Sequence, residues 1–248
     1  MMLHKLTKKL SEFRQADRKF TWLYYEFKWR YFAYRHRPQV LLNLAYDREH
    51  GVETATELFL EAAGVPQADV SRGNVVYRPL TEQLFRAALD SVQMDVTLFT
   101  FVDIGSGKGK VLFMAAERPF RRILGIEYAP GLHEVAVRNI AQYRSYTQKC
   151  RVIESVHADA LHYPLPDGPL MLFIFNSLST EFMRALLLSL DHGVAAEPDR
   201  PVVLIYTNLR TVSEVRGAFD GLTRLKIARR TRNYVVIANP AAALTAAR

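Results

Sequence analysis

The segment Phe101-Val102-Asp103-Ile104-Gly105-Ser106-Gly107-Lys108-Gly109-Lys110 places three closely spaced glycines directly after a short, mostly apolar stretch that contains one acid. A strand that gives way to closely spaced glycines and then to a helix brings the backbone close to a bound ligand. Seventeen residues beyond Lys110, Glu127 ends a second apolar run, 123–126. An acidic residue at the end of the next strand is placed to bind ribose hydroxyls. The two features together predict a nucleoside-containing cofactor.

The spacing of the glycines excludes two common phosphate-binding loops. The dinucleotide motif G-x-G-x-x-G, counted from Gly105, requires glycine at Lys110. A P-loop ending at Gly109 and Lys110 requires glycine in place of Ile104 and Ser or Thr in place of Val111, and moving its register back by two residues does not restore it. The pattern that remains is acid-x-Gly-x-Gly-x-Gly. A glycine-rich turn without a ligand is the alternative.

The pattern beginning at Asp103 resembles motif I of the class I S-adenosylmethionine-dependent methyltransferases. In that family the loop surrounds the methionine end of the cofactor, which carries no phosphate. The resemblance implies methyltransferase activity with S-adenosylmethionine as cofactor and S-adenosylhomocysteine as product. It implies these cofactor-binding residues: Asp103, Gly105, Ser106, Gly107, Gly109, Glu127, Tyr128, Asp159, Ala160, Asn176 and Tyr77.

The roles of these residues follow the family pattern. The glycine loop shapes the methionine pocket and Glu127 holds the ribose. Asp159 is expected to bond the adenine amino group, and the small Ala160 leaves space for the ring. Tyr77 precedes the first strand, where methyltransferases often fold a segment over the cofactor, so it is expected to help close the site. A simple turn residue is the alternative interpretation of Tyr77.

The order of elements along the chain repeats that of the family. Apolar periodicity predicts helices at 111–116, 132–143, 180–190 and 212–219, and strands at 121–127, 150–154, 170–175, 201–206, 222–229 and 233–239. The turn between the last two strands is too short for a parallel crossover, so these strands are expected to pair antiparallel. We therefore expect an α/β fold: a doubly wound, mostly parallel seven-stranded sheet ending in an antiparallel hairpin, with an N-terminal helical extension.

Three regions are expected from these patterns. Residues 1–75 form a basic, aromatic and helical extension, residues 76–240 form the methyltransferase domain, and residues 241–248 form a tail. Within 51–75, turn-forming residues surround a short predicted helix at 54–63. A further helix is expected to begin near Glu82, with Thr81 as its N-cap.

The sequence around Asn176 bears on the identity of the methyl acceptor. Asn176 follows the apolar run 170–175 and is expected to contact the acceptor or the methionine end of the cofactor. The loop, the segment Gly125-Ile126-Glu127 and a strand ending in Asn are similar to the non-SET histone-lysine methyltransferases and related protein-lysine methyltransferases. Nucleic-acid amino-methyltransferases commonly continue from this position with Pro-Pro and an aromatic residue. Here Ser177, Leu178 and Ser179 follow, which disfavours a nucleobase acceptor.

The acceptor is therefore expected to be a protein lysine or another amine, with a small molecule as an alternative. The aromatic residue that would line an amine channel is missing from its usual position, and Phe175 and Tyr206 are the candidates to replace it. A cofactor-binding assembly or regulatory subunit without catalytic activity is the alternative from another functional class. Asn176 is the candidate catalytic residue.

Composition limits the other possibilities. The single cysteine, Cys150, excludes an internal disulfide, and no His/Cys cluster has metal-ligand spacing. His157 and His162, which flank Asp159, are interpreted as solvated side chains. No apolar run is long enough to span a bilayer and the N-terminus has no signal-peptide pattern, so a cytoplasmic location is expected.

The net charge of +8 is concentrated at the N-terminus. Residues 1–37 contain ten Lys and Arg side chains against three acids, which leaves the methyltransferase domain nearly neutral. Helical spacing places aromatic residues in two stripes on nearly opposite sides: Phe13, Phe20, Tyr24, Phe27, Tyr31 and Tyr34 on one, and Trp22, Tyr25, Trp29 and Phe32 on the other. A helix apolar on two sides needs two partners. We expect one to be the protein's own domain, and the candidates for the other are a second protomer, another partner, a substrate or a membrane surface. The alternative is burial of both sides within the monomer.

Overall fold

The computed structural model describes residues 38–66, 76–175, 179–207 and 217–242. Its contacts divide the chain into two compact units, Met1–Ala45 and Tyr46–Arg248. Residues 38–50 are helical and run across this division. No helix in the described ranges has the length and apolar character needed to cross a membrane.

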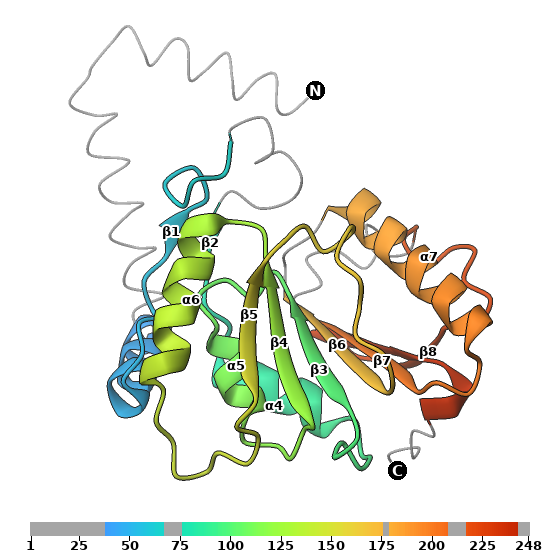
Figure 1. Ribbon diagram of the computed structural model, residues 1–248, viewed down its shortest axis with the longest axis horizontal. Helices are drawn as coiled ribbons and strands as arrows, with labels where there is room; N and C mark the ends of the chain where they lie inside the picture. The colour runs from blue at the N-terminus through green and yellow to red at the C-terminus, as the bar shows by residue number, and fades with distance from the viewer. Residues whose placement is uncertain (1–37, 67–75, 176–178, 208–216, 243–248) are drawn as a thin grey trace, which may run out of the picture. The chain divides into compact units, whose positions relative to one another are not determined.

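The second unit contains a seven-stranded sheet with the strand order β5-β4-β3-β6-β7-β9-β8 (Figure 1). Its strands are β3 (Thr100–Ile104), β4 (Arg122–Glu127), β5 (Ile153–His157), β6 (Leu170–Phe175), β7 (Val202–Thr207), β8 (Lys226–Arg230) and β9 (Tyr234–Ala238). β3 to β7 pair in parallel, whereas β9 pairs antiparallel with both β7 and β8. The expected fold class, a mostly parallel sheet ending in an antiparallel hairpin, is confirmed.

Helices pack on both faces of this sheet because its central strands are apolar on both sides. Every residue of β3 is buried, and neighbouring residues point to opposite faces. Phe101 faces α4 (Glu82–Asp90) and α5 (Lys110–Ala115), whereas Val102 faces α7 (Thr180–Ala196). α6 (Pro130–Gln142) packs against β5 and β4. A short 3-10 helix, η1 (Pro240–Ala242), follows β9.

Thr81 is the N-cap of α4, as the sequence predicts. Thr81 has an extended backbone, and its side-chain oxygen accepts a hydrogen bond from the backbone N–H of Leu84 at 3.2 Å. This bond satisfies one of the N–H groups that have no partner in the first turn of a helix. Predicted and observed boundaries also agree within one or two residues for α5, α6, β4, β6, β7 and β9.

The helix predicted at 54–63 is wrong. The segment instead contains strand β1 (Leu58–Phe59), which pairs antiparallel with β2 (Val76–Tyr77). The Asp47 carboxylate accepts hydrogen bonds from the backbone N–H groups of Thr54 and Ala55, at 2.6 and 2.7 Å. Contacts with residues outside the segment, from Asp47 and from β2, therefore hold it in a non-helical path.

Four further elements differ from the expected boundaries or lie partly outside the described residues. β5 begins at Ile153 rather than near 150, and α7 extends to Ala196, beyond the expected end at 190. The strand expected at 222–229 begins only at Lys226, because the backbone N–H groups of residues 223–225 donate to the Asp191 side chain instead of to a neighbouring strand. Of the helix predicted at 212–219, residues 212–216 lie outside the described residues, and 217–219 form a turn.

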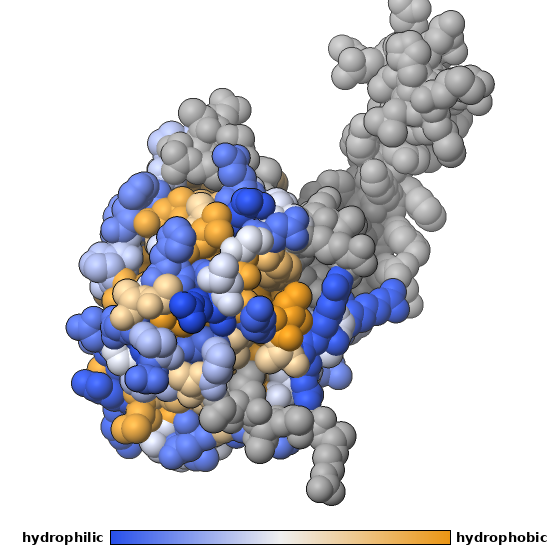
Figure 2. All heavy atoms as spheres, turned by 90° about the vertical axis from the view of Figure 1, so that its right-hand side faces the viewer, coloured by the Kyte–Doolittle hydropathy of each residue, from blue (hydrophilic) through white to orange (hydrophobic). Residues whose placement is uncertain are grey.

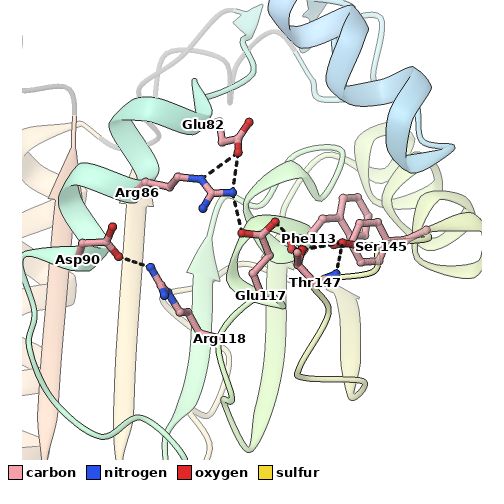
Figure 3. Close-up of polar contacts among 9 residues, drawn as sticks. Glu82, Arg86, Asp90, Phe113, Glu117, Arg118, Ser145 and Thr147 are labelled. Atoms are coloured by element: carbon pink, nitrogen blue, oxygen red, sulfur yellow. Dashed lines mark hydrogen bonds and ion pairs between the residues drawn. The ribbon is translucent and has the colours of Figure 1, made fainter.

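The outer side of α4 is joined to neighbouring segments by polar contacts, as Figure 3 shows. Arg86 bonds both Glu82, within α4, and Glu117, after α5, at 2.7 and 2.8 Å. Asp90 pairs with Arg118, and Glu117 accepts a hydrogen bond from Thr147 at 3.0 Å. These contacts are exposed, so they contribute little individually to stability.

Asp191 on α7 anchors the turn that leads into β8. Its buried carboxylate accepts hydrogen bonds from the backbone N–H groups of Thr223, Arg224 and Leu225, at 2.7–2.9 Å, and from the Thr223 hydroxyl. Burial favours a higher pKa for Asp191, but these hydrogen bonds lower the pKa to about 2.

Figure 2 shows the side of the molecule that carries α7 and β8, where hydrophobic patches are separated by hydrophilic residues.

Candidate cofactor site

The glycine loop, residues 105–109, follows β3 directly and contacts the carboxyl end of β4. The backbone N–H groups of Gly105 and Ser106 donate to the carbonyl of Ile126, at 2.8 and 3.2 Å. Gly107 has φ +56°, and Gly109, the N-cap of α5, has φ +89°. These left-handed conformations are costly for residues with a side chain, which explains the glycines that the sequence motif contains.

Tyr77 supplies a second reason for glycine at position 107. A Cβ atom added at Gly107 would lie 2.3 Å from Cε2 of the Tyr77 ring. The Tyr77 hydroxyl donates to the carbonyl of Thr54 at 3.0 Å, which fixes the ring over the loop. Tyr77 therefore belongs to a short strand at the site rather than to a simple turn.

Gly125, in the middle of β4, is a further residue on which the loop depends. A Cβ atom there would lie 2.6 Å from the Ser106 hydroxyl oxygen and 2.9 Å from Cδ1 of Leu112. In the sequence, Gly125 stands out only within the family resemblance of Gly125-Ile126-Glu127, which gives it no role of its own. Its small size lets the glycine loop and α5 pack directly on the strand.

Two carboxyl groups stand at the ends of adjacent strands. Glu127 accepts hydrogen bonds from the backbone N–H groups of Gly107 and Ala129, both at 2.7 Å. Burial raises the pKa of Glu127, while these hydrogen bonds oppose the shift. Burial also raises the pKa of Asp103 well above its ordinary value, and the charge of Glu127 raises it further. The pair is suited to a ligand that brings positive charge.

A cavity opens at the carboxyl ends of β3, β4, β5 and β6, which is where ligands bind in doubly wound sheets. Every residue predicted to bind the cofactor lines this cavity except Gly109 and Asn176. Gly109 instead faces α5, since a Cβ atom there would lie 3.3 Å from the Phe113 ring. Asn176, the candidate catalytic residue, lies outside the described residues.

Asp159 lies in the loop after β5, with Ala160 beside it on the cavity wall. One oxygen of Asp159 accepts from the backbone N–H of Leu161 at 3.0 Å, and the other lies 3.3 Å from Nδ1 of His162. His157, the last residue of β5, contacts the carbonyl of Tyr128 through Nε2 at 2.9 Å. Across the described ranges, no three His, Cys, Asp or Glu side chains are grouped to hold a metal ion.

The cavity is also lined by residues that no sequence motif indicated. Phe182 from the first turn of α7 lines it together with Phe175, which was one of two candidates for an aromatic wall. The other candidate, Tyr206, is not among the lining residues. Lys110 also lines the cavity, and burial lowers its pKa to about 8. Its Nζ lies 4.7 Å from the centre of the Tyr46 ring.

Asn139 on α6 holds the glycine loop against the segment before β1. Its side-chain amide donates to the carbonyls of Glu53 and Lys108, at 3.0 and 2.9 Å, and accepts from the Glu53 N–H at 2.9 Å. The Lys108 ammonium group pairs with the Glu53 carboxylate. Asn139 is buried, so these bonds are shielded from water. The helical periodicity of 132–143 contained no signal for this role.

Comparison with known proteins supports the same interpretation of the site. A family described as a methyltransferase domain matches residues 102–185, which include the glycine loop, Glu127 and Asp159. This match spans about a third of the chain. No curated protein sequence matches the chain.

Several solved structures are similar to this fold. Geranyl diphosphate C-methyltransferase from Streptomyces coelicolor A3(2), solved with S-adenosyl-L-homocysteine, has 16% identity and a TM-score of 0.44, covering 63% of this chain and 78% of that one. Precorrin-6y C5,15-methyltransferase from Geobacter metallireducens GS-15 has 18% identity and a TM-score of 0.43, covering 63% and 88%. Ribosomal protein L11 methylase from Lactobacillus delbrueckii subsp. bulgaricus has 19% identity and a TM-score of 0.43, covering 64% and 77%.

These structural similarities are too distant to assign a substrate to this chain. The family match is independent of them and covers the cofactor loop itself. The matched domain and the confirmed fold support a class I S-adenosylmethionine-dependent methyltransferase.

Proposed function

We propose that this protein binds S-adenosylmethionine in the cavity above β3–β6 and transfers its methyl group to an amine. The observation that carries the proposal is the meeting of the glycine loop with Asp103, Glu127 and Asp159 around one cavity. The loop brings backbone close to the ligand, and the carboxyl groups supply acceptors for its hydroxyl and amino groups.

The charge and the polar atoms of the site fit this cofactor. S-adenosylmethionine carries a positive sulfonium, which complements the buried Asp103 and Glu127 pair, whose pKa values are both raised. The hydroxyl oxygen of Ser106 is buried beside the cavity and has no hydrogen-bond partner among the described residues. Buried polar groups rarely stay unpaired, so a polar ligand atom or a water is a fitting partner for it.

Glu127 is suited to two tasks at once. One of its oxygens accepts the backbone N–H of Gly107 and the other accepts that of Ala129. A carboxylate oxygen has a second lone pair, so Glu127 can hold the loop in shape and still accept the ribose hydroxyls. On the family resemblance, Asp159 and Ala160 hold the adenine.

The protein residues orient the reactants and exclude water. When bound, S-adenosylmethionine supplies an electrophilic methyl group on its sulfonium sulfur. Tyr77 closes one side of the cavity over Gly107, and Phe175 and Phe182 form apolar wall on the side of β6 and α7. Holding two reactants at near-attack distance in a site shielded from water supplies much of the acceleration in such a transfer.

The aromatic wall supports an amine as the acceptor. A charged ammonium group loses its hydration on entering an apolar pocket, which lowers its pKa and favours the neutral, nucleophilic form. Phe175 and Phe182 offer such a surface beside the carboxyl end of β6. A protein lysine is the first acceptor to test.

Cofactor binding is tested by titrating the purified protein with S-adenosylmethionine and S-adenosylhomocysteine. Glu127→Ala is expected to weaken both affinities at least tenfold, which corresponds to about 1.4 kcal/mol. Glu134→Ala, an exposed acid at the start of α6, is the matched control and leaves both unchanged. Equal affinities in the wild type and Glu127→Ala would exclude the proposed ribose contact, and no binding to the wild type would exclude the cofactor.

The pH dependence of binding tests the charge argument separately. Because the pKa values of Asp103 and Glu127 are raised, their ionised forms are lost early as the pH falls. The affinity for the cationic S-adenosylmethionine should then fall more steeply than that for S-adenosylhomocysteine, which lacks the sulfonium charge. Parallel pH profiles for the two ligands would contradict this electrostatic role.

The acceptor is tested by incubating the protein with labelled S-adenosylmethionine and cell extract, with Glu127→Ala as the inactive control. Label that enters a protein band and survives mild alkali supports an N-methylated side chain, because carboxyl methyl esters hydrolyse under those conditions. Label confined to small molecules favours the alternative acceptor class. Cofactor binding without any labelled product across varied extracts favours a non-catalytic subunit.

A further inference from the structure

The helical residues 38–50 have an unusual distribution of polar and apolar side chains. Their buried positions are 43, 46, 47 and 50, which share one side of a helix. Asn43, Asp47 and His50 are polar, and Tyr46 is the only largely apolar member of the buried group. A surface helix ordinarily buries an apolar stripe and exposes its polar side.

Four exposed residues in the first half of the same helix are large and aliphatic, whereas the exposed residues of its second half include Arg48 and Glu49. Val40, Leu41, Leu42 and Leu44 are 46%, 54%, 64% and 44% exposed, and they lie within five consecutive residues. We call these four residues the aliphatic face; at 3.6 residues per turn they spread around roughly half of the helix circumference. An exposed cluster of this kind indicates a surface for a partner rather than for water.

The sequence that leads directly into the aliphatic face is strongly basic. Residues 1–37 carry +7 of the net charge of +8, together with both tryptophans of the chain, Trp22 and Trp29. Lys and Arg beside Trp, Tyr and Leu are typical of segments that lie at a membrane surface, where the cations meet lipid headgroups and the apolar residues enter the acyl boundary.

Charge distinguishes between the possible partners of this surface. A second copy of the chain would bring two segments of +7 together, so like charges would oppose the contact. An anionic bilayer surface instead attracts every Lys and Arg that comes close to it. We propose that residues 1–45 bind the surface of a bilayer that contains anionic phospholipid, with the aliphatic face at the acyl boundary. This peripheral contact is a further function, independent of cofactor binding.

Vesicle flotation of the full-length protein tests the proposal without using activity as a readout. Vesicles of phosphatidylcholine alone are compared with vesicles containing about 30% phosphatidylserine, at low and high salt. The protein should float with the anionic vesicles and at least tenfold less with the neutral ones. High salt should weaken the interaction because it screens the headgroup charge.

Two variants divide the proposed contact into its apolar and its basic part. Leu41→Glu combined with Leu42→Glu should reduce flotation with anionic vesicles at least tenfold, and so should Lys5→Glu combined with Lys8→Glu and Lys9→Glu. The matched control is Leu98→Glu, which changes a leucine of similar exposure, 69%, in the second unit. Circular dichroism and thermal unfolding verify that each variant is folded.

Three outcomes would overturn the proposal. The first is an absence of flotation with either vesicle type, and the second is equal loss in the Leu98→Glu control. The third is a dimer in sedimentation without lipid that Leu41→Glu with Leu42→Glu dissociates, because the aliphatic face would then bind a second copy. Cofactor titration of the same preparations shows whether the second unit is intact, so a failure of this proposal is distinguishable from a failure of the proposed function.

Discussion

Replacement of Gly107 by alanine tests whether the ring of Tyr77 and the glycine loop depend on one another. The new Cβ atom would lie 2.3 Å from Cε2 and 2.6 Å from Cδ2 of Tyr77, well inside the closest normal contact of about 3.0 Å. Either the ring or the loop has to move. The loop carries the Gly107 N–H that Glu127 accepts, so movement of the loop also disturbs the proposed ribose site.

The size of the effect follows from two separable contributions. Alanine at φ +56° costs about 1 kcal/mol for the left-handed backbone. Displacing the Tyr77 ring adds an overpacking cost of about 1–3 kcal/mol and endangers the hydrogen bond from its hydroxyl to Thr54, which contributes about 1 kcal/mol. We expect Gly107→Ala to lower the free energy of unfolding by about 3 kcal/mol.

Gly168→Ala is the matched control, because Gly168 has φ +80° but no atom within 4 Å of the added Cβ. It should cost about 1 kcal/mol, from the backbone alone. Urea unfolding measures both variants, and titration with S-adenosylhomocysteine measures the site. We expect at least a tenfold loss of affinity for Gly107→Ala and none for Gly168→Ala.

Tyr77→Ala completes a double-mutant cycle with Gly107→Ala. Removing the ring should relieve the overlap, so the cost of the double variant should fall below the sum of the single costs by about 1 kcal/mol or more. Equal destabilisation by Gly107→Ala and Gly168→Ala, or strictly additive costs in the cycle, would refute the claim that Tyr77 packs on Gly107.

Three further substitutions probe other parts of the fold and the site. Gly125→Ala should weaken cofactor binding, because its Cβ would lie 2.6 Å from the Ser106 hydroxyl oxygen and would displace that side chain. Gly193→Ala, on α7, places its Cβ in open space and should leave binding unchanged. Isothermal titration of both variants with the cofactor compares them directly. Asn139→Asp should raise the dissociation constant of the cofactor several-fold and also lower the melting temperature, because it replaces two donors to the Glu53 and Lys108 carbonyls by an acceptor. An unchanged affinity in a destabilised protein would limit Asn139 to a structural role. Asp191→Asn should lower the free energy of unfolding by about 2 kcal/mol at neutral pH, because the pKa of Asp191 is about 2 in the folded protein and 3.8 in the unfolded chain. This contribution is complete above the unfolded pKa and is lost as the pH falls from about 4 towards 2, so urea unfolding of wild type and variant should converge in that range.

Local patterns in the sequence determined most of the sheet. The apolar run 170–174 and the mostly apolar segments 101–104 and 123–126 became the buried strands β6, β3 and β4, because segments of this kind are typical of parallel strands that are covered on both faces. The short connection before Tyr234 determined the antiparallel pairing of β8 and β9, since a parallel crossover needs many more residues. Asp103, Glu127 and Asp159 came together because the carboxyl ends of parallel strands meet at one edge.

Only the tertiary structure decided the contacts that complete the site. The segment predicted as a helix at 54–63 instead forms β1, because Asp47 and strand β2, both outside the segment, bind its backbone. The packing of Tyr77 on Gly107 and the position of Asn139 between Glu53 and Lys108 join residues 30 or more positions apart. Periodicity and motif spacing describe a residue's near neighbours in the chain, whereas these roles depend on side chains brought together by folding. The glycine loop was therefore recognisable from its own sequence, but the residues that hold it in place became identifiable only when the sheet had brought them into contact.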